Sequence, residues 1–189
     1  KFDDVMAFGK EVDIITVEIE HINVDALDEL ERMGKKVFPQ SKVLRMVQDK
    51  GLQKEFYRIN TIPTAEFRLI ERKSELHDYV DMLPLMQKMR KSGYDGRGVM
   101  PIRSVADFDK AFEEPSVLEK MVDFEKEISV IVSRNSNGDV SHFPVVELEF
   151  NAEANLVEFL FSPATISKAH EAEAIRIART VIQKLEMTG

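Results

Sequence analysis

The glycine-rich stretch KSGYDGRG at residues 91–98 combines residue types that can do chemistry. Its glycines at 93, 96 and 98 remove side chains from a turn, so that successive backbone N–H groups can converge on an anion such as a phosphate. The lysine and the arginine of the stretch supply positive charge. A polar loop with ordinary turn glycines is the alternative, because the spacing matches neither G-x-G-x-x-G nor G-x-x-x-x-G-K-S/T.

Charged residues on either side of this stretch favour a nucleotide. Lys88 lies in an otherwise apolar predicted strand, where an inward lysine would need an anion. Glu119 and Glu127 bracket the segment EKMVDFEKE, where carboxylates could accept hydrogen bonds from an adenine amino group or ribose hydroxyls and a backbone N–H between them could meet a base nitrogen. The alternative is that both glutamates are simply solvated, since the chain has 34 acidic residues.

The composition is that of an ordinary globular protein, with 43% hydrophobic and 32% charged residues over 189 positions. A net charge of −8 argues against a general nucleic-acid or membrane surface, since both partners are anionic. The chain has no cysteine, and no apolar run reaches the roughly 18 residues that a membrane span needs. Its first residues lack the apolar core of a secretion signal, so we expect a cytoplasmic protein.

The elements that must position these residues begin with a predicted β-α-β unit. It consists of a strand at 13–17, a helix at 24–34 and a strand at 36–38. Two helical pieces at 41–47 and 50–58, broken near Gly51, lead to Ile62-Pro63, where we place a boundary.

A small α+β unit is predicted next, and a region of strands follows it. The α+β unit has strands at 64–70 and 85–89 and helices at 74–82 and around 105–112. The strand region has strands at 117–122, 127–134, 141–150 and 155–161. The second and third of these flank Asn135–Asp139, whose Asn-Gly pair indicates an antiparallel hairpin. Ser167 is predicted to cap a long amphipathic helix.

Several blocks of sequence share the order and spacing of one enzyme family. They are EIEHI at 18–22, VFP at 37–39, QDKGLQK at 48–54, IPTAEF at 62–67, Lys88 with SGYDGRGV at 92–99, VLEKMVDFEKEISVIVSR at 117–134 and FPVVE at 143–147. They run along nearly the whole chain, and GYDGRG with a lysine upstream is the most specific of them. On these blocks the chain resembles the 5-(carboxyamino)imidazole ribonucleotide synthetases, which are ATP-grasp enzymes of purine biosynthesis and the ATPase subunit of phosphoribosylaminoimidazole carboxylase.

The resemblance implies a fold and a reaction. The fold is α/β to α+β, with the remainder of a Rossmann-like domain at 1–63, a small ATP-grasp subdomain at 64–122 and the first part of the large subdomain at 123–189. Family members use ATP and magnesium to convert bicarbonate to carboxyphosphate. The carboxyl group then passes to the exocyclic amine of 5-aminoimidazole ribonucleotide, with release of ADP and phosphate. The resemblance also suggests a homodimer, without nucleic-acid or membrane partners.

Site residues follow from the same resemblance. Lys50 and Lys88 would contact ATP, with Lys88 reaching the phosphates, and Arg97 and Lys88 would be catalytic. The loop covering the phosphates would comprise Gly93, Tyr94, Asp95, Gly96, Arg97, Gly98 and Val99. The hinge that reads adenine would comprise Glu119, Lys120, Met121 and Val122, with Glu127 on the ribose. Glu18, Tyr94 and Arg97 would contact the ribonucleotide.

Departures from the family pattern affect the metal site and one nucleotide contact. Leu148–Phe150 follow PVVE where many members have a histidine or an asparagine. The family's N-terminal glycine-rich turn has no counterpart, and its metal ligands would lie beyond Gly189. We therefore expect a central fragment that holds no magnesium ligand and is inactive alone.

Two other functions are open. Another ATP-grasp ligase or a biotin-type carboxylase would share Lys88, the glycine-rich stretch and Glu119, but should not need Tyr94 and Arg97 at this spacing. A non-catalytic nucleotide-binding module would use the glycine-rich stretch only as structure.

Overall fold

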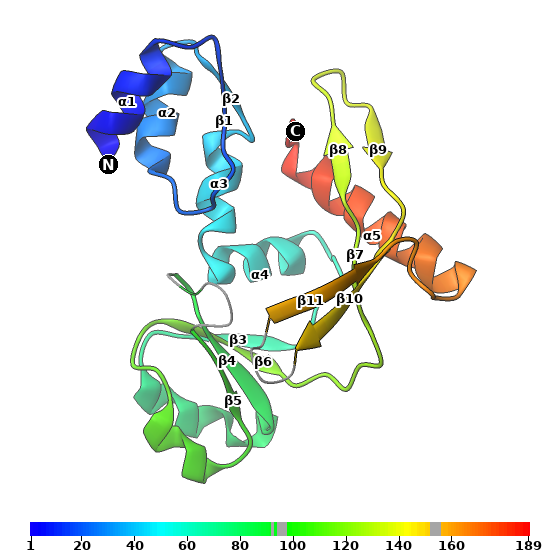
Figure 1. Ribbon diagram of the computed structural model, residues 1–189. Coiled ribbons are helices and arrows are strands. Elements are labelled where there is room, and N and C mark those ends of the chain that lie inside the picture. The colour runs from blue at the N-terminus through cyan, green and yellow to red at the C-terminus, as the bar shows by residue number, and fades with distance from the viewer. Residues whose placement is uncertain (92, 94–97, 152–155) are drawn as a thin grey trace.

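A computed structural model describes residues 1–91, 93, 98–151 and 156–189. Figure 1 shows an N-terminal part that ends in helix α4, a middle part built on the sheet of β3 to β6, and a C-terminal part with β7 to β11 and helix α5. Of the catalytic and loop residues expected above, Tyr94, Asp95, Gly96 and Arg97 lie outside the described residues. No described helix is both long and apolar enough to cross a bilayer.

The N-terminal part contains the predicted β-α-β unit. Strands β1 (Ile14–Thr16) and β2 (Lys36–Phe38) pair in parallel, and α2 (Val24–Arg32) connects them after Asn23, whose side chain accepts the Ala26 N–H at 2.8 Å. Their apolar side chains form one buried cluster, which comprises Ile15, Val24, Leu27, Leu30, Val37 and Leu44.

Helix α1 (Phe2–Lys10) was not expected from the sequence. It packs so closely on α2 that a Cβ atom at Gly9 would clash with a methyl carbon of the buried Leu30. Glycine has a low helix propensity, so its presence argued against a helix in this stretch of sequence. In the structure, the missing side chain of Gly9 allows α1 to approach Leu30 of α2.

Helices α3 (Ser41–Val47) and α4 (Lys50–Ile59) confirm the two helical pieces that follow. The break lies at Gln48 and Asp49, just before Gly51. The Asp49 side chain caps α4 by accepting the N–H groups of Gly51 at 2.8 Å and Leu52 at 3.3 Å.

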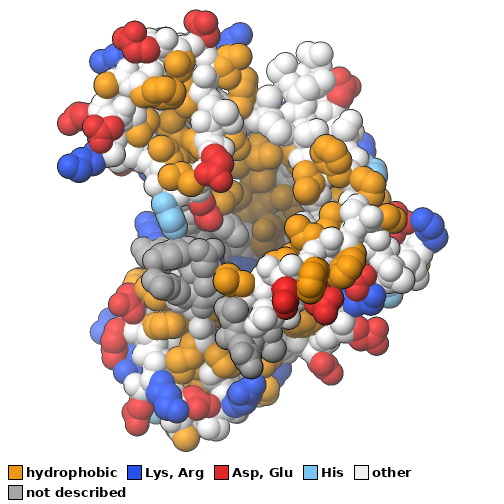
Figure 2. Space-filling model, in the orientation of Figure 1, with side chains coloured by type: hydrophobic (Ala, Val, Ile, Leu, Met, Phe, Trp, Pro, Cys, Tyr) orange, Lys and Arg blue, Asp and Glu red, His pale blue; other side chains and the backbone are white. Residues whose placement is uncertain are grey.

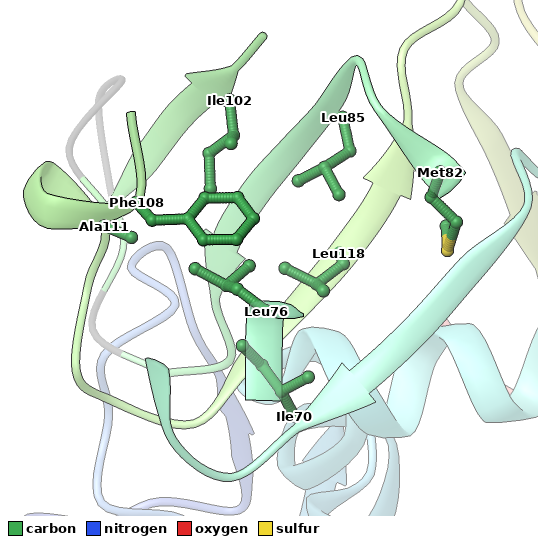
Figure 3. Close-up of a cluster of buried hydrophobic side chains, with 8 residues drawn as sticks. All are labelled: Ile70, Leu76, Met82, Leu85, Ile102, Phe108, Ala111 and Leu118. Carbon is green, nitrogen blue, oxygen red and sulfur yellow. The ribbon is translucent and has the colours of Figure 1, made fainter. Parts of the chain in front are cut away.

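The middle part is a four-stranded antiparallel sheet with the strand order β3-β6-β4-β5. Its strands are β3 (Phe67–Ile70), β4 (Leu85–Met89), β5 (Val99–Ile102) and β6 (Ser116–Lys120). Strand β3 begins later than predicted, and β5 was not predicted. Side chains from one face of the sheet converge with Leu76 and Phe108 in a buried core (Figure 3).

The two helices predicted for this part are 3-10 helices. The first, η1 (Lys73–Met82), contains a non-helical residue at Tyr79, and the second, η2 (Val105–Lys110), is a short turn. Ser104 and Asp107 form a capping box at the start of η2, in which the side chain of each residue accepts the backbone N–H of the other. Both segments bury an apolar residue against the sheet, so packing rather than helix length stabilises them.

The C-terminal part confirms the Asn-Gly hairpin but divides both long strands. Strands β8 (Val132–Arg134) and β9 (Val140–His142) flank the turn, where Gly138 has a φ of +94°. Strands β7 (Glu127–Ser129) and β10 (Val146–Asn151) pair further along and, with β11 (Leu156–Phe161), form a second sheet in the order β11-β10-β7. Pro144, which has no N–H, lies at the division of the second strand.

Helix α5 (Lys168–Leu185) follows the capping residue Ser167, as predicted, and contacts β8. Hydrophobic side chains gather over β10 and β11 and in the hollow between the N-terminal part and α5 (Figure 2). All residues of β11 are exposed, including Leu160 and Phe161. In the described part of the chain, no other element covers the side chains of β11.

A buried ion pair joins α4 to the end of β4. The Arg90 guanidinium donates from Nε and Nη2 to the two Asp49 oxygens, each at 2.9 Å, and only 4% of the Asp49 side chain is exposed. Burial would raise the pKa of Asp49, but the hydrogen bonds from Arg90 and the α4 backbone lower it below its ordinary value. A Cβ atom at Gly51 would lie 2.5 Å from Arg90 Nε, so only glycine leaves room for this pair.

Replacing Arg90 by glutamine should lower the free energy of unfolding by about 3 kcal/mol, because the Asp49 charge stays buried without its partner. Chemical denaturation measures this change. Arg68→Gln is the matched control, since Arg68 pairs with Glu66 at an exposed position, and it should cost less than about 0.5 kcal/mol. Equal losses in the two variants would contradict a structural role for the buried pair.

Candidate functional site

A cluster of charged side chains lies where α4 meets the middle sheet. Lys54 of α4 and Lys88 of β4 both bind the Glu119 carboxylate of β6: Lys54 Nζ lies 2.9 Å from Oε1, and Lys88 Nζ lies 2.8 Å from Oε2. The side chains of Lys54 and Glu119 are each 13% exposed, and that of Lys88 is 30% exposed. We call Lys54, Lys88 and Glu119 the charge cluster.

Strand alternation explains why the cluster forms here. Strands β4 and β6 are antiparallel, with Met86 opposite Glu119 and Lys88 opposite Val117. Leu85 belongs to the hydrophobic core, and Lys88, three residues later, points to the other face because successive side chains alternate. The anion that Lys88 was expected to need is therefore supplied by the protein itself.

The cluster has more positive than negative charge. Burial would raise the pKa of Glu119, but hydrogen bonds and charge from Lys88 and Lys54 more than offset it, so the pKa lies below its ordinary value. Glu119 is thus ionised near neutral pH and faces two ammonium groups. Burial together with the Glu119 charge raises the pKa of the nearby Tyr57 hydroxyl. An anionic ligand would balance the remaining charge.

The glycine-rich stretch begins and ends beside this cluster. Lys50 donates its backbone N–H to the Arg90 carbonyl at 2.9 Å, and its Nζ lies 3.4 Å from the Gly93 carbonyl. At the other end Gly98 has a φ of +74°, its carbonyl accepts the Met89 N–H, and Val99 pairs with Lys88. A Cβ atom at Gly98 would lie 3.0 Å from the Gly93 Cα, so the two ends of the stretch approach each other closely.

The segment expected to read adenine follows Glu119 directly. The Lys120 N–H donates to the Glu66 carbonyl, and the Met121 N–H donates to the Pro84 carbonyl. The Lys120 side chain turns away to the carbonyls of Met82 and Leu83. Among the described residues the Val122 N–H has no hydrogen-bond partner, which leaves it available to a base nitrogen.

Glu127 lies at the start of β7, exposed, beside a pocket of about 330 Å³. The lining of this pocket includes Phe124 and Leu148–Phe150, so the structure brings Glu127 next to the segment that departs from the family pattern. Glu18 is exposed in the loop after β1, and no hydrogen bond or ion pair joins it to the charge cluster within the described ranges.

Lys54 was missed as a site residue, although it ends the block QDKGLQK. The available signal was its spacing, because Lys50 and Lys54 lie four residues apart on α4 and so share one face of the helix. What the sequence could not supply is the distance to Glu119, which lies 65 positions further along the chain.

Comparison with protein families divides the chain in two. Residues 55–189 match the ATP-grasp domain, and residues 1–48 match the ribonucleotide synthetase preATP-grasp domain. Lys54 lies between these two matches, whereas Lys88 and Glu119 lie within the ATP-grasp match.

Relatives and solved structures agree with these family matches. The chain is 34% identical to phosphoribosylaminoimidazole carboxylase, chloroplastic, of Vigna aconitifolia over 98% of its length and 34% of the plant protein. N5-carboxyaminoimidazole ribonucleotide synthetase from Thermotoga maritima is 33% identical, with a TM-score of 0.85 over 99% of this chain and 48% of that chain. The Aspergillus clavatus synthase in complex with ADP and 5-aminoimidazole ribonucleotide is 27% identical, with a TM-score of 0.88 over 100% of this chain and 50% of that chain.

Acid should weaken the contribution of Glu119 to stability. Its pKa is lower in the folded than in the unfolded chain, so the unfolded chain binds more protons between the two values. The contribution is therefore complete above the ordinary value of 4.5 and is lost as pH falls through the folded-state pKa. The difference in unfolding free energy between wild type and Glu119→Gln should shrink with decreasing pH below that value. A difference that does not change with pH would show that Glu119 makes no such ion pairs.

Proposed function

The chain belongs to the ATP-grasp family, and from this premise we propose that a longer protein containing it uses ATP and bicarbonate to carboxylate 5-aminoimidazole ribonucleotide. The chain spans about half of the solved relatives and a third of the plant relative, so the whole activity is assigned to the full-length protein. The Thermotoga maritima relative is named for the carboxylated product of this reaction, and the Aspergillus clavatus synthase was solved with 5-aminoimidazole ribonucleotide bound.

The observation that carries the proposal is the excess positive charge of the cluster beside the glycine-rich stretch. Lys88 lies on the strand that leads into the stretch, and Lys50 contacts its first glycine. Both ammonium groups can therefore face phosphates held there. Glu119 and the Val122 N–H lie further along β6 and its continuation, at the position proposed for the adenine.

We assign the remaining roles as follows. Gly93, Gly98 and Val99 border the phosphate loop, whose other proposed members are Tyr94, Asp95, Gly96 and Arg97. Lys120, Met121 and Val122 form the hinge, Glu127 binds the ribose hydroxyls, and Glu18, Tyr94 and Arg97 contact the ribonucleotide. The division of the chain at residues 63 and 122, a cytoplasmic location and a homodimer belong to the same proposal.

The proposed chemistry needs no covalent enzyme intermediate. Transfer of the ATP γ-phosphoryl group to bicarbonate gives carboxyphosphate and ADP. Attack of the exocyclic amine on the carboxyl carbon then releases phosphate and forms the C–N bond. Lysines and backbone N–H groups assist by holding the reactants and neutralising charge on the phosphoryl oxygens.

Magnesium, the usual metal of ATP-grasp enzymes, neutralises phosphate charge when bound. Within the described ranges no group of three histidines, aspartates or glutamates is placed to hold a metal ion. We therefore assign no magnesium ligand to these residues and derive no step from the metal.

The full-length protein should release ADP from ATP in the presence of magnesium and bicarbonate only when 5-aminoimidazole ribonucleotide is added. A coupled ADP assay measures this dependence. ADP release that ignores the ribonucleotide would reject this acceptor and favour another ATP-grasp ligase or carboxylase.

Lys88→Ala should lower kcat/KM at least tenfold, about 1.4 kcal/mol of transition-state stabilisation, because a cation on the phosphates is lost. Lys73→Ala is the control, since Lys73 lies in the same part of the chain and pairs with Glu113 at the surface. Steady-state kinetics of the two variants separates the roles. An unchanged Lys88→Ala enzyme would support a purely structural role for this strand and the glycine-rich stretch.

A further inference from the structure

The two lysines of the charge cluster are held very differently. Lys54 Nζ contacts Glu119, donates to the Thr64 hydroxyl and lies 5.9 Å from the centroid of the Phe67 ring. Lys88 Nζ has Glu119 as its one partner among the described residues, and its side chain is more than twice as exposed. Lys54 is therefore anchored, and Lys88 is the lysine that can leave.

The departure of Lys88 would change the charge balance around Glu119. A phosphate held beyond hydrogen-bond reach of Lys88 in its present position would draw Nζ away from Oε2 and break this hydrogen bond. Glu119 is mostly buried, and a buried carboxylate without a cation is strongly destabilised. Lys54 on Oε1 is the group that prevents this outcome.

We infer that Lys54 is a positioning residue for nucleotide binding: it keeps Glu119 neutralised and in place while Lys88 moves its hydrogen bond from Glu119 to a phosphate. This inference rests on the proposed function, since it requires a phosphate ligand at Lys88. It gives Lys54 a role in ATP affinity without any contact between Lys54 and the nucleotide. Without Lys54, ATP binding must leave a buried carboxylate unpaired or keep Lys88 on Glu119.

The test compares the binding of ATP and of adenosine to the full-length protein by calorimetry at fixed magnesium and salt. Lys54→Met should weaken ATP binding at least tenfold and adenosine binding less than twofold, because only the phosphates recruit Lys88. Lys35→Met is the matched control. Lys35 binds the carbonyls of Lys10 and Val12 in the N-terminal part, so this variant removes the same charge and should leave ATP affinity unchanged.

A double-mutant cycle distinguishes positioning from direct contact. In a Glu119→Gln background no carboxylate needs neutralising, so Lys54→Met should change ATP affinity less than twofold. The same tenfold loss in both backgrounds would show that Lys54 binds the phosphates directly, and the inference would be wrong. If Lys54→Met does not fold, Lys54→Gln removes the charge while keeping hydrogen-bond donors, and the same cycle applies.

The controls also separate this inference from the proposed function. Wild-type protein that binds ATP while Lys54→Met binds it equally well would overturn the inference and leave the proposed function intact. Wild-type protein that binds no ATP would overturn both.

Discussion

A buried carboxylate must be neutralised, and this requirement at Glu119 connects the elements on which the candidate site depends. The cations come from α4 and β4, while the carboxylate comes from β6. Their meeting fixes the helix against the sheet on the face opposite the hydrophobic core. Because two cations meet one anion, the carboxylate is neutralised and positive charge remains for a ligand.

A second buried pair supports this arrangement at the N-terminus of α4. Asp49 caps the helix and accepts two hydrogen bonds from Arg90, directly after β4. The helix is thus fixed at its capping residue Asp49 and again at Lys54 in its first half. With both attachments in place, the start of the glycine-rich stretch has a defined position relative to Lys50 and Lys88.

Local signals predicted much of the fold, and contacts distant in sequence determined the rest. The β-α-β unit, the Asn-Gly hairpin and the Ser167 cap depend on nearby residues, and the structure has all of them. Helix α1 was not predicted, because the close contact between Gly9 and Leu30 that favours it joins residues distant in the sequence. The sequence identified Lys88 and Glu119 as candidate site residues from their charge and their neighbours. Lys54 could be identified only from the structure, where α4 packs against β6 and brings it to Glu119. The assigned roles of these residues are still predictions.

On binding ATP, Glu119 should release Lys88 to a nucleotide phosphate and keep Lys54. A crystal structure of the full-length protein with ATP tests it most directly. We expect Lys88 Nζ to lie about 2.8 Å from a phosphate oxygen, with Lys54 still bound to Glu119. Lys88 still paired with Glu119 while the phosphates lie elsewhere would contradict it.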